Sequence, residues 1–475
     1  MKTITSISTK IILTAFCLFI LGNTYSQANK TTSKTLFGKA VKVKNANPNN
    51  GIIRCATVEY EQYLQEKNPS RMTNAQFEAW LAPLVKKQIA LRASSKTAVS
   101  TIITIPVVVH VIHNGQAIGT APNITDNQVQ SQITVLNQDY RRMLGTPGGT
   151  STNLVAADVQ IEFVLAKQDP DGNPTNGIDR VNMCQSSWSE TDINETVKPS
   201  TIWDPTQYMN MWTLKFTRND LLGYAQFPNS SGLQGLNAFG GDANTDGVVS
   251  RYDVFGSSDF GSTFLLAAPY DKGRTMTHEV GHYLGLRHTW GDGNGHPAIP
   301  ADPTTTPPTP ASPASPDCTA TDYCADTPQE GYEHYDCITT YDTCPTDIGN
   351  DMVENYMDYT DDACMNIFTQ NQKERIMVVM ANSDRRKTLA LSTKGTAIIL
   401  YANDAEIKTV TNYCSSNITD CASLPTPTNK NVVLTNRGTS ALTSASLKYS
   451  IAGGANQTQT WTGSLAQNES IIVTL

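Results

Sequence analysis

The sequence predicts an α+β fold, and three observations support that prediction. Residues 105–113 form a β-branched apolar run that indicates a largely buried strand. Helical spacing of apolar residues follows at 124–142 and again at 273–286 and 371–381, without a repeating strand–helix–strand rhythm. From about residue 397 the pattern changes to short alternating segments, which predict a separate small β domain. A chain of 475 residues has room for roughly three domains.

Residues 1–26 predict a secretory signal peptide. Lys2 and Lys10 precede the apolar run 11–21, and small polar residues follow it. That run is too short to span a bilayer, and no later segment is long and apolar enough. We therefore expect an exported protein, secreted or extracellular and without a transmembrane segment. Association with the cell surface through the C-terminal region is left open.

Residues 27–95 are predicted to be a pro-segment. Helical patterns at 58–67 and 73–89 precede a Ser/Thr-rich stretch, 93–104, that suits an exposed cleavage linker. Residues 27–92 hold eleven Lys or Arg against four Glu, a net charge of +7. Residues 93–475 hold 22 Lys or Arg against 39 acidic residues, a net charge of −17, so these two pieces should attract each other. The overall charge of −8 gives no indication of a nucleic-acid partner.

Two further domains are expected after the pro-segment. Residues 96–390 should form the central α+β domain, interrupted by an extended loop at 297–316 that contains eight prolines. Residues 395–475 should form an immunoglobulin-like β-sandwich, which one interpretation takes to be cut short at the end of the chain. The expected strands are 159–167, 209–217 and 248–255 in the central domain, and 397–401, 430–434, 446–451, 457–461 and 471–475 in the last.

The stretch from His278 to His288 matches H-E-x-x-H-x-x-G-x-x-H at every fixed position. On a helix, His278 and His282 lie on one face, and Gly285 allows the chain to turn and bring His288 to the same metal ion. Three imidazoles leave a fourth tetrahedral position open for water, as catalytic zinc requires. Glu279 stands beside the first ligand, where it can act as the general base. The competing interpretation, an amphipathic helix with incidental histidines, is weak because the whole chain has only seven.

The longer motif also predicts a methionine-containing turn downstream, and Asn355-Tyr356-Met357-Asp358-Tyr359 follows. With this turn, the sequence resembles a metzincin metalloprotease of the pappalysin family, close to its ulilysin-like members. The resemblance spans about residues 54–385. The matching blocks are 105–113, 161–181, 222–228, 246–257, 322–328 and 355–369, besides the histidine motif.

The resemblance implies a metzincin-type zinc protease domain with a mixed sheet, a zinc-binding helix and a Met-turn. Met357 would form the floor of the metal site, and the hydroxyl of Tyr359 would stabilise the tetrahedral intermediate. Residues 247–255 would be the edge strand of the cleft. Cleavage before arginine or lysine is implied as well, with Asp361 or Asp362 as the pocket carboxylate; the alternative is solvated surface charge.

Cys55 lies in Arg54-Cys55-Ala56-Thr57, where related propeptides carry Arg-Cys-Gly-Thr. The resemblance implies that its thiolate binds the zinc in the latent form and excludes water. The alternative is that Cys55 pairs with another cysteine. Of ten cysteines, Cys17 lies in the signal peptide and nine remain, and this odd number favours one unpaired thiol.

Disulfides are expected in an exported protein. The resemblance implies the pairs Cys318–Cys344 and Cys337–Cys364. Cys414 and Cys421 stand close together in the β domain, which suggests a local bridge. Whether Cys184 and Cys324 pair is left open.

Structural calcium is expected from the same resemblance, with Asp322 and Thr327 as candidate oxygen ligands. A second candidate is the segment from Asp242 to Asp253, which mimics an EF-hand loop with glycine at its sixth place. Its twelfth residue is Asp rather than Glu, and no flanking helices are evident. A turn into the edge strand is the favoured interpretation of that segment.

The sequence therefore predicts a secreted zinc endopeptidase, made as a latent zymogen and inhibited by its own pro-segment, that acts on proteins or peptides. The alternative is a surface adhesion or binding protein with a vestigial protease domain. A complete ligand set, an intact Glu279 and a candidate inhibitory Cys55 favour the enzyme, because an inactive domain needs no inhibitor.

Overall fold

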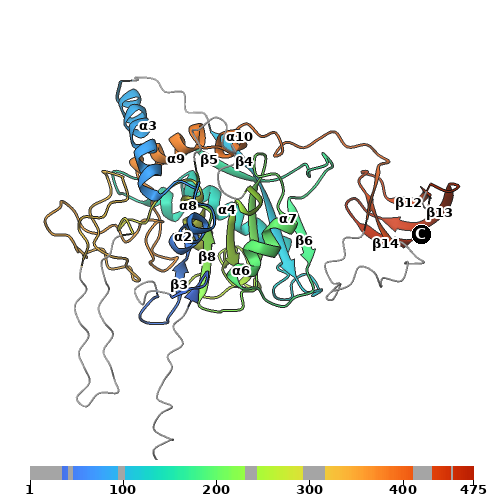
Figure 1. The fold of residues 1–475 in the computed structure, drawn as a ribbon, viewed down its shortest axis with the longest axis horizontal. Helices are drawn as coiled ribbons and strands as arrows, with labels where there is room; N and C mark the ends of the chain where they lie inside the picture. The colour runs from blue at the N-terminus through green and yellow to red at the C-terminus, as the bar shows by residue number, and fades with distance from the viewer. Residues whose placement is uncertain are drawn as a thin grey trace, which may run out of the picture. The chain divides into compact units, whose positions relative to one another are not determined.

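The computed structural model describes residues 35–40, 46–94, 102–229, 243–292, 316–409, 431–450 and 453–475. The predicted signal peptide and the pair Cys414 and Cys421 lie outside these residues. The chain divides into two units, 1–43 and 44–475. In the first, β1 (Thr35–Leu36) and β2 (Lys39–Ala40) pair as a small antiparallel hairpin. The second contains the central sheet, the helices around it and the C-terminal strands (Figure 1).

The central sheet has the strand order β3-β8-β9-β7-β4-β5, and β6 pairs with the far end of β4. All pairs are parallel except β8 with β9. This mixed sheet, with helices packed on it, confirms the predicted α+β class. The strands are β3 (Ile53–Cys55), β4 (Ile103–His113), β5 (Ile161–Leu165), β6 (Ile178–Asn182), β7 (Met209–Leu214), β8 (Leu221–Ala225) and β9 (Val248–Arg251).

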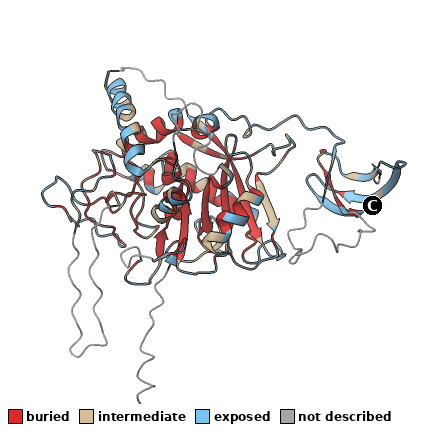
Figure 2. Ribbon diagram, viewed as in Figure 1, coloured by how far each residue is buried: buried red, intermediate tan, exposed pale blue. Residues whose placement is uncertain are grey.

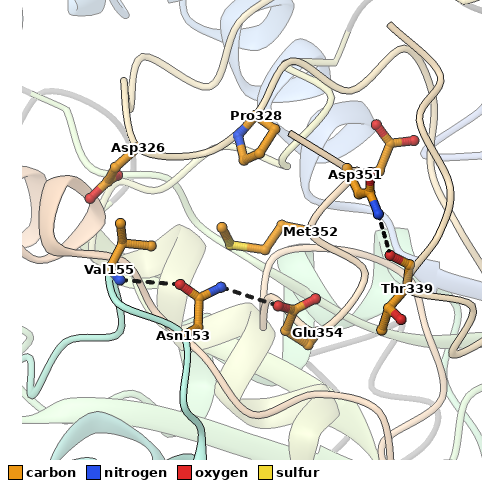
Figure 3. Close-up of a pocket in the computed structure, with 9 residues that line it drawn as sticks. Asn153, Val155, Asp326, Pro328, Thr339, Asp351, Met352 and Glu354 are labelled. Carbon is orange, nitrogen blue, oxygen red and sulfur yellow. Dashed lines mark hydrogen bonds between the residues drawn. The ribbon is translucent and has the colours of Figure 1, made fainter. Parts of the chain in front are cut away.

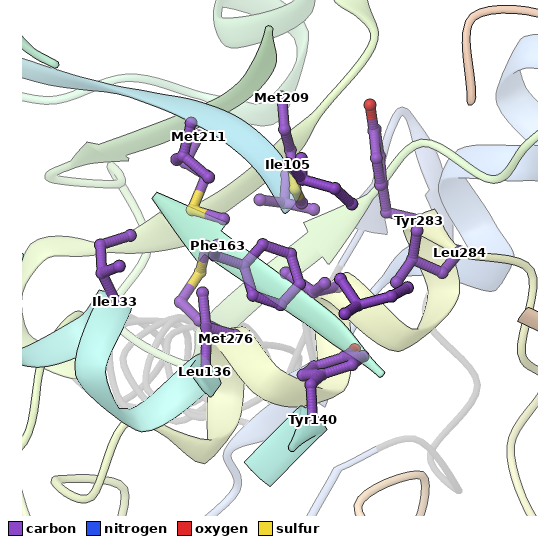
Figure 4. Packing of buried hydrophobic residues seen from close by; sticks show 14 of the residues in the cluster. Ile105, Ile133, Leu136, Tyr140, Phe163, Met209, Met211, Met276, Tyr283 and Leu284 are labelled. Atoms are coloured by element: carbon purple, nitrogen blue, oxygen red, sulfur yellow. The ribbon is translucent and has the colours of Figure 1, made fainter. Parts of the chain in front are cut away.

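Three helices pack with the sheet around one apolar core. Figure 4 shows Phe163 from β5 and Met211 from β7 beside Ile133 and Met276 from the helices. Thr125 caps the first of these helices, and a capping box of Thr369 and Gln372 begins the last. These helices are α4 (Asp126–Tyr140), α8 (Arg274–Tyr283) and α9 (Gln370–Asn382). Figure 2 shows that the burial is concentrated in this sheet and in α8.

Short helical segments connect the main elements. A continuous helical stretch over 190–201 consists of α6, a π-helical turn η2 and α7, and it follows β6 in the sequence. The segments are α5 (Pro147–Thr150), α6 (Glu190–Asp192), η2 (Ile193–Val197), α7 (Lys198–Thr201), η3 (Ala243–Thr245), η4 (Tyr252–Val254) and α10 (Arg386–Leu389).

The prediction that 247–255 forms the edge strand is wrong. β9 lies between β8 and β7, and its first three residues are buried. β8 is the outermost strand that the predicted central domain supplies, and β3 from the predicted pro-segment pairs with its outer edge. β8 runs antiparallel to its inner neighbour, a reversal of direction that apolar patterning alone does not reveal.

The predicted pro-segment supplies β3 and two helices, α2 (Thr57–Lys67) and α3 (Asn74–Ser94). From α3, Phe77 and Leu81 pack against Phe227 and Val379 of the central domain. Buried ion pairs add to this contact, since Glu78 receives hydrogen bonds from Arg375 at 2.6 and 2.7 Å. The segment is therefore an integral part of the packed structure.

The C-terminal strands form two antiparallel sheets, and five buried apolar residues lie among them, as a small β-sandwich requires. The expected strand at 397–401 is wrong: these residues are not in a strand, and Ile399 is 85% exposed. The strands are β10 (Ala405–Thr409), β11 (Asn431–Asn436) and β14 (Ser470–Thr474) in one sheet, and β12 (Leu442–Tyr449) and β13 (Gln457–Leu465) in the other.

Within the part of the chain that the structure describes, no helix has the length and apolar character needed to cross a membrane.

Candidate active site

Helix α8 places the first two histidines of the motif. It begins after Gly273, whose φ of 80° lies in the left-handed region, and all ten of its residues are buried. His278 and His282 stand one turn apart on the same face. Gly285, with φ of 97°, turns the chain away from the helix axis, and His288 returns to the two histidines.

The three Nε2 atoms converge on one point. They lie 3.1 Å apart between His282 and His278, 3.0 Å between His282 and His288, and 3.3 Å between His278 and His288. Each Nδ1 has an oxygen partner instead: the Tyr356 carbonyl at 2.8 Å, the Leu286 carbonyl at 2.8 Å, and the Asp292 carboxylate. With Nδ1 donating its proton, each Nε2 presents a lone pair to the other two.

The three Nε2 atoms cannot hydrogen-bond to one another when each of them presents a lone pair. Burial and the neighbouring imidazoles hold the pKa values of His278 and His282 well below the usual histidine range, so both rings are neutral. Three nitrogen lone pairs directed at one point are the donor set of a metal ion, and this geometry suits tetrahedral zinc. The residues present therefore fit a zinc ion.

Cys55 lies at the fourth position of this group. Its Sγ atom and the histidine nitrogens all lie within 4.8 Å of one another, and all four residues are buried. The thiol also lies 3.4 Å from Oε2 of Glu279. Cys55 is a free cysteine, so the structure does not place it in a disulfide. Three histidines and one cysteine make a closed tetrahedral zinc set.

Glu279 is fully buried beside the histidines. Its Oε2 accepts hydrogen bonds from the Thr57 hydroxyl at 2.9 Å and from the Cys55 thiol. Its Oε1 has no hydrogen-bond partner among the described residues. Burial raises the pKa of Glu279 to about 8, although Thr57 and Cys55 act in the opposite direction. The pro-segment thus covers the carboxylate that the motif predicts as general base.

Met357 packs against helix α8 at Gly281. A Cβ built at Gly281 would lie 2.4 Å from the Met357 sulfur, which is closer than any contact a real Cβ makes. Tyr359, two residues on, packs its ring against Trp290 and His288, with centroids 4.7 and 4.9 Å apart. Its hydroxyl donates to the Cys55 carbonyl at 3.3 Å. Both residues therefore lie beside the histidine group.

Arg54, which sequence reasoning did not single out, is buried close to His278. Its guanidinium donates to Asp362 Oδ1 and to the Thr360 carbonyl, each at 2.8 Å, and its side chain is 1% exposed. Asp362 Oδ2 accepts from the backbone N–H groups of Lys272 and Arg274 at 3.0 and 3.1 Å. Of the two candidate carboxylates, Asp362 is the buried one, whereas Asp361 is only partly buried.

The structure contains both disulfides that the resemblance implied, Cys318–Cys344 and Cys337–Cys364. Cys184 is disulfide-bonded, whereas Cys324 is a buried free thiol, so these two do not pair with each other.

The two calcium candidates differ in what their side chains contact. Asp322 is buried, and it accepts hydrogen bonds from the Cys324 N–H and the Thr327 hydroxyl, each at 2.9 Å. In the EF-hand-like segment, Asp246 forms ion pairs with Arg385 and Arg386. Asp253 of the same segment pairs with Arg251 at 2.7 Å. Both carboxylates of this segment that the structure describes are therefore engaged by arginines rather than arranged as in an EF-hand, and Asp242 lies outside the described residues.

Figure 3 shows a polar pocket of about 380 Å³ between Asp326, Met352 and Glu354, where Asn153 bonds Glu354 at 3.3 Å. None of the residues that line it belongs to the histidine group, and it is open to solvent. The three histidines and Glu279 lie instead beneath the pro-segment.

Comparison with known proteins agrees with this geometry. The model of the peptidase M43 family, described as pregnancy-associated plasma protein-A, matches residues 192–381. An extracellular metalloprotease of Arthroderma otae is 30% identical over 274 residues, which cover 58% of this chain and 76% of that protein. One from Verticillium alfalfae is 30% identical over 289 residues, covering 60% of this chain and 78% of that one.

Solved structures are similar as well. A promirolysin variant of Tannerella forsythia is 35% identical, covers 71% of this chain and 97% of that one, and has a TM-score of 0.52. Mature mirolysin of the same organism, in complex with a cleaved peptide, is 40% identical over 62% of this chain and 97% of that one, with a TM-score of 0.49. The chain belongs to the pappalysin family: it is an extracellular zinc metalloendopeptidase made as a latent zymogen.

Proposed function

We propose that His278, His282 and His288 hold the catalytic zinc and that Glu279 is the general base. The convergence of three Nε2 atoms within 3.3 Å of one another carries this proposal. When bound, the zinc would supply Lewis-acid activation of water and of the peptide carbonyl. Residues 27–95 are then the pro-segment, 96–390 the catalytic domain and 395–475 a β-sandwich.

Each active-site residue has a distinct task in the proposed reaction. Glu279, once uncovered, takes a proton from the attacking water on a carboxylate oxygen and delivers it to the leaving amine. The Tyr359 hydroxyl donates a hydrogen bond to the carbonyl oxygen as negative charge develops on it. The peptide adds to the outer edge of β8, which β3 occupies in the zymogen.

Latency in this proposal has two components. The Cys55 thiolate takes the fourth position at the metal and excludes water. The Thr57 hydroxyl donates to Glu279 at 2.9 Å and accepts from the Ala225 N–H at 2.8 Å, so it ties the base to the edge strand. Removal of the pro-segment would free the ligand position, the base and the strand edge together.

The preference for arginine or lysine after the scissile bond is part of the proposal. Arg54 is a basic side chain already seated against a buried carboxylate beside the metal site, 2.8 Å from Asp362. Its departure leaves Asp362 with two backbone donors on Oδ2 and with Oδ1 facing the vacated pocket. A substrate guanidinium or ammonium would restore the lost pairing.

We also propose a structural calcium ion at Asp322 and Thr327. Burial raises the pKa of Asp322 to about 7, which is the response of a carboxylate that lacks a neutralising ligand. A calcium ion would neutralise it, and the disulfides nearby hold the surrounding loop in place.

The direct test is activity of the activated protein on casein with and without a zinc chelator. We expect Glu279→Gln to lose at least about 10³-fold in kcat/KM, since it removes the proton carrier but keeps the side-chain shape. Glu162→Gln, a partly exposed glutamate on β5, is the matched control and should keep activity. Zinc content by mass spectrometry should stay at one per chain in both variants; full activity in Glu279→Gln would refute the assignment.

Latency is tested with Cys55→Ala in the full-length protein. We expect faster appearance of activity or autolysis than in the parent, because the fourth position becomes open to water. Cys324→Ala removes the other buried free thiol and should leave latency unchanged. If full-length Cys55→Ala shows no more proteolytic activity than the parent protein, the Cys55 thiol is not the inhibitory group.

A further inference from the structure

Lys198, the first residue of α7, is a buried cation without a polar partner. Its side chain is fully buried, and its Nζ has no hydrogen-bond partner among the described residues. Three aromatic rings surround it: those of Tyr60 and Tyr224, with centroids at 4.7 Å, and that of Trp212 at 5.4 Å. The ammonium is therefore in contact with ring faces, and Asp246 acts on it by charge without a hydrogen bond among the described residues.

Two of these three rings belong to the catalytic domain and are fixed there. The Tyr224 hydroxyl accepts a hydrogen bond from Asn194 at 3.0 Å. The Trp212 indole N–H donates to the Thr201 hydroxyl at 2.9 Å. Both walls are therefore held by contacts that do not involve the pro-segment.

The third ring is supplied by the pro-segment. Tyr60 stands on α2 with no exposed surface and meets the Tyr224 ring edge-on, with centroids 5.0 Å apart. Its hydroxyl lies 3.4 Å from Gln226 Oε1. When the pro-segment leaves, this wall is lost and the face of Lys198 that it covers is opened.

The vacated position lies along the substrate edge of the sheet. Cys55 is opposite Gly223, Thr57 bonds the Ala225 N–H, and Tyr60 follows within one helical turn. Gly223 faces Glu279, since a Cβ there would lie 3.3 Å from the glutamate Cγ. Because side chains alternate along a strand, Tyr224 points to the opposite face, where Lys198 lies.

We propose that Lys198 and Tyr224 form a substrate subsite that accepts an aromatic side chain, tyrosine or phenylalanine, in place of Tyr60. This inference rests on the proposed function, because it requires that the pro-segment leaves and that a peptide adds to β8. The subsite lies on the Ala225 side of the metal, whereas the Arg54 pocket contacts residues 360 and 362. The aromatic subsite and the site that Arg54 occupies would therefore bind side chains at different positions of one peptide.

The chemistry favours an aromatic occupant over an aliphatic one of similar size. An aromatic substrate side chain can place the negative face of its ring against the Lys198 ammonium and pack edge-on against Tyr224. Leucine supplies neither interaction. A tyrosine hydroxyl can additionally reach Gln226, as that of Tyr60 does. An acidic side chain would pair with Lys198 by charge, and the experiment separates these outcomes.

The test is cleavage of a randomised peptide library by the activated wild-type enzyme, with cleavage sites read by mass spectrometry. We expect one position, distinct from any that selects arginine or lysine, to be enriched in tyrosine and phenylalanine. Matched peptides with Tyr, Phe, Leu, Glu or Ala at that position then give kcat/KM ratios. The Tyr-to-Ala ratio should be about threefold to tenfold.

Lys198→Met and Tyr224→Leu should each bring the Tyr-to-Leu ratio close to one. Lys215→Met, an exposed lysine next to β7, is the matched control and should keep the wild-type ratio. Enrichment of acidic residues, or equal cleavage of the Tyr and Leu peptides, would overturn the aromatic subsite. Failure to cleave any peptide would instead contradict the proposed function.

Discussion

The pro-segment closes the cleft at two buried sites, and the two differ in which side supplies the charge. At the first, Arg54 of the pro-segment brings a cation to Asp362 of the catalytic domain, 2.8 Å away. At the second, the catalytic domain supplies the cation, Lys198, and the pro-segment supplies only the ring of Tyr60. Arg54 and Lys198 are equally buried, at 1% and 0% exposure.

Because of this difference, we expect the two sites to respond differently to pH. The guanidinium of Arg54 meets a carboxylate and a carbonyl, so its burial is compensated. Lys198 packs among aromatic rings without a hydrogen-bond partner among the described residues, and burial lowers its pKa to about 7 although the charge of Asp246 acts in the opposite direction. Of these two sites, the first should therefore contribute more to the stability of pro-segment closure, and the second should make closure sensitive to pH.

The largest effect is expected from breaking the first site in the zymogen. Asp362→Asn should weaken closure of the pro-segment by about 3–5 kcal/mol, because it leaves the Arg54 charge buried and unpaired. The readout is hydrogen exchange of the β3 and α2 amides in full-length protein that also carries Glu279→Ala, so that autolysis cannot interfere.

Asp361→Asn changes the neighbouring, less buried carboxylate and serves as the control for Asp362→Asn. Thermal unfolding shows whether both variants remain folded. Wild-type protection of β3 in Asp362→Asn would contradict the assignment of this ion pair as the main contact.

The second site should give a smaller effect that depends on pH. In the closed zymogen the pKa of Lys198 is about 7, and in the open form it should return toward the ordinary value of 10.5. Between these values closure releases a proton, so closure strengthens as pH rises, by at most about 1.4 kcal/mol per pH unit. Acidification from pH 9 to pH 7 should therefore loosen α2.

Hydrogen exchange of α2 at several pH values, corrected for the intrinsic rate, measures this slope. The Glu279→Ala background also removes a second buried group whose pKa is raised to about 8. Lys198→Met should flatten the profile, and Lys215→Met should not. An unchanged slope in Lys198→Met would mean that another group is responsible.

The smallest effect is expected at the surface of the same helix. Lys67 on α2 pairs with Glu195, but both side chains are about half exposed, at 48% and 51%. Solvent and salt screen such a pair, so Lys67→Ala should leave α2 exchange within the scatter of replicate measurements. A loss as large as that of Asp362→Asn would show that net charge, rather than buried pairing, holds the pro-segment.

The parts of the site that were predictable from sequence are those encoded by local spacing. His278, His282 and Gly285 are fixed by helical geometry, whereas the roles of Met357 and Tyr359 were implied by the family resemblance. The family resemblance placed Cys55 at this group, and the structure brings its sulfur there. The mixed α+β class likewise followed from patterning over windows of ten or more residues.

What sequence did not reveal depends on residues far apart in the chain. The surroundings of Lys198 come from Tyr60, Trp212 and Tyr224, on three different elements, and no spacing rule connects them. Arg54 finds Asp362 across 308 residues. The role of β8 as edge strand follows from a reversal of direction, which leaves no trace in hydrophobicity.

The contact between Gly281 and Met357 constrains how this enzyme can vary. A Cβ at position 281 would lie 2.4 Å from the methionine sulfur, so a helix position outside the fixed letters of the histidine motif is tied to the turn 76 residues later. Alanine at 281 would require a smaller or displaced side chain at 357. Among diverging or designed relatives, these two positions should therefore change as a pair or remain as they are.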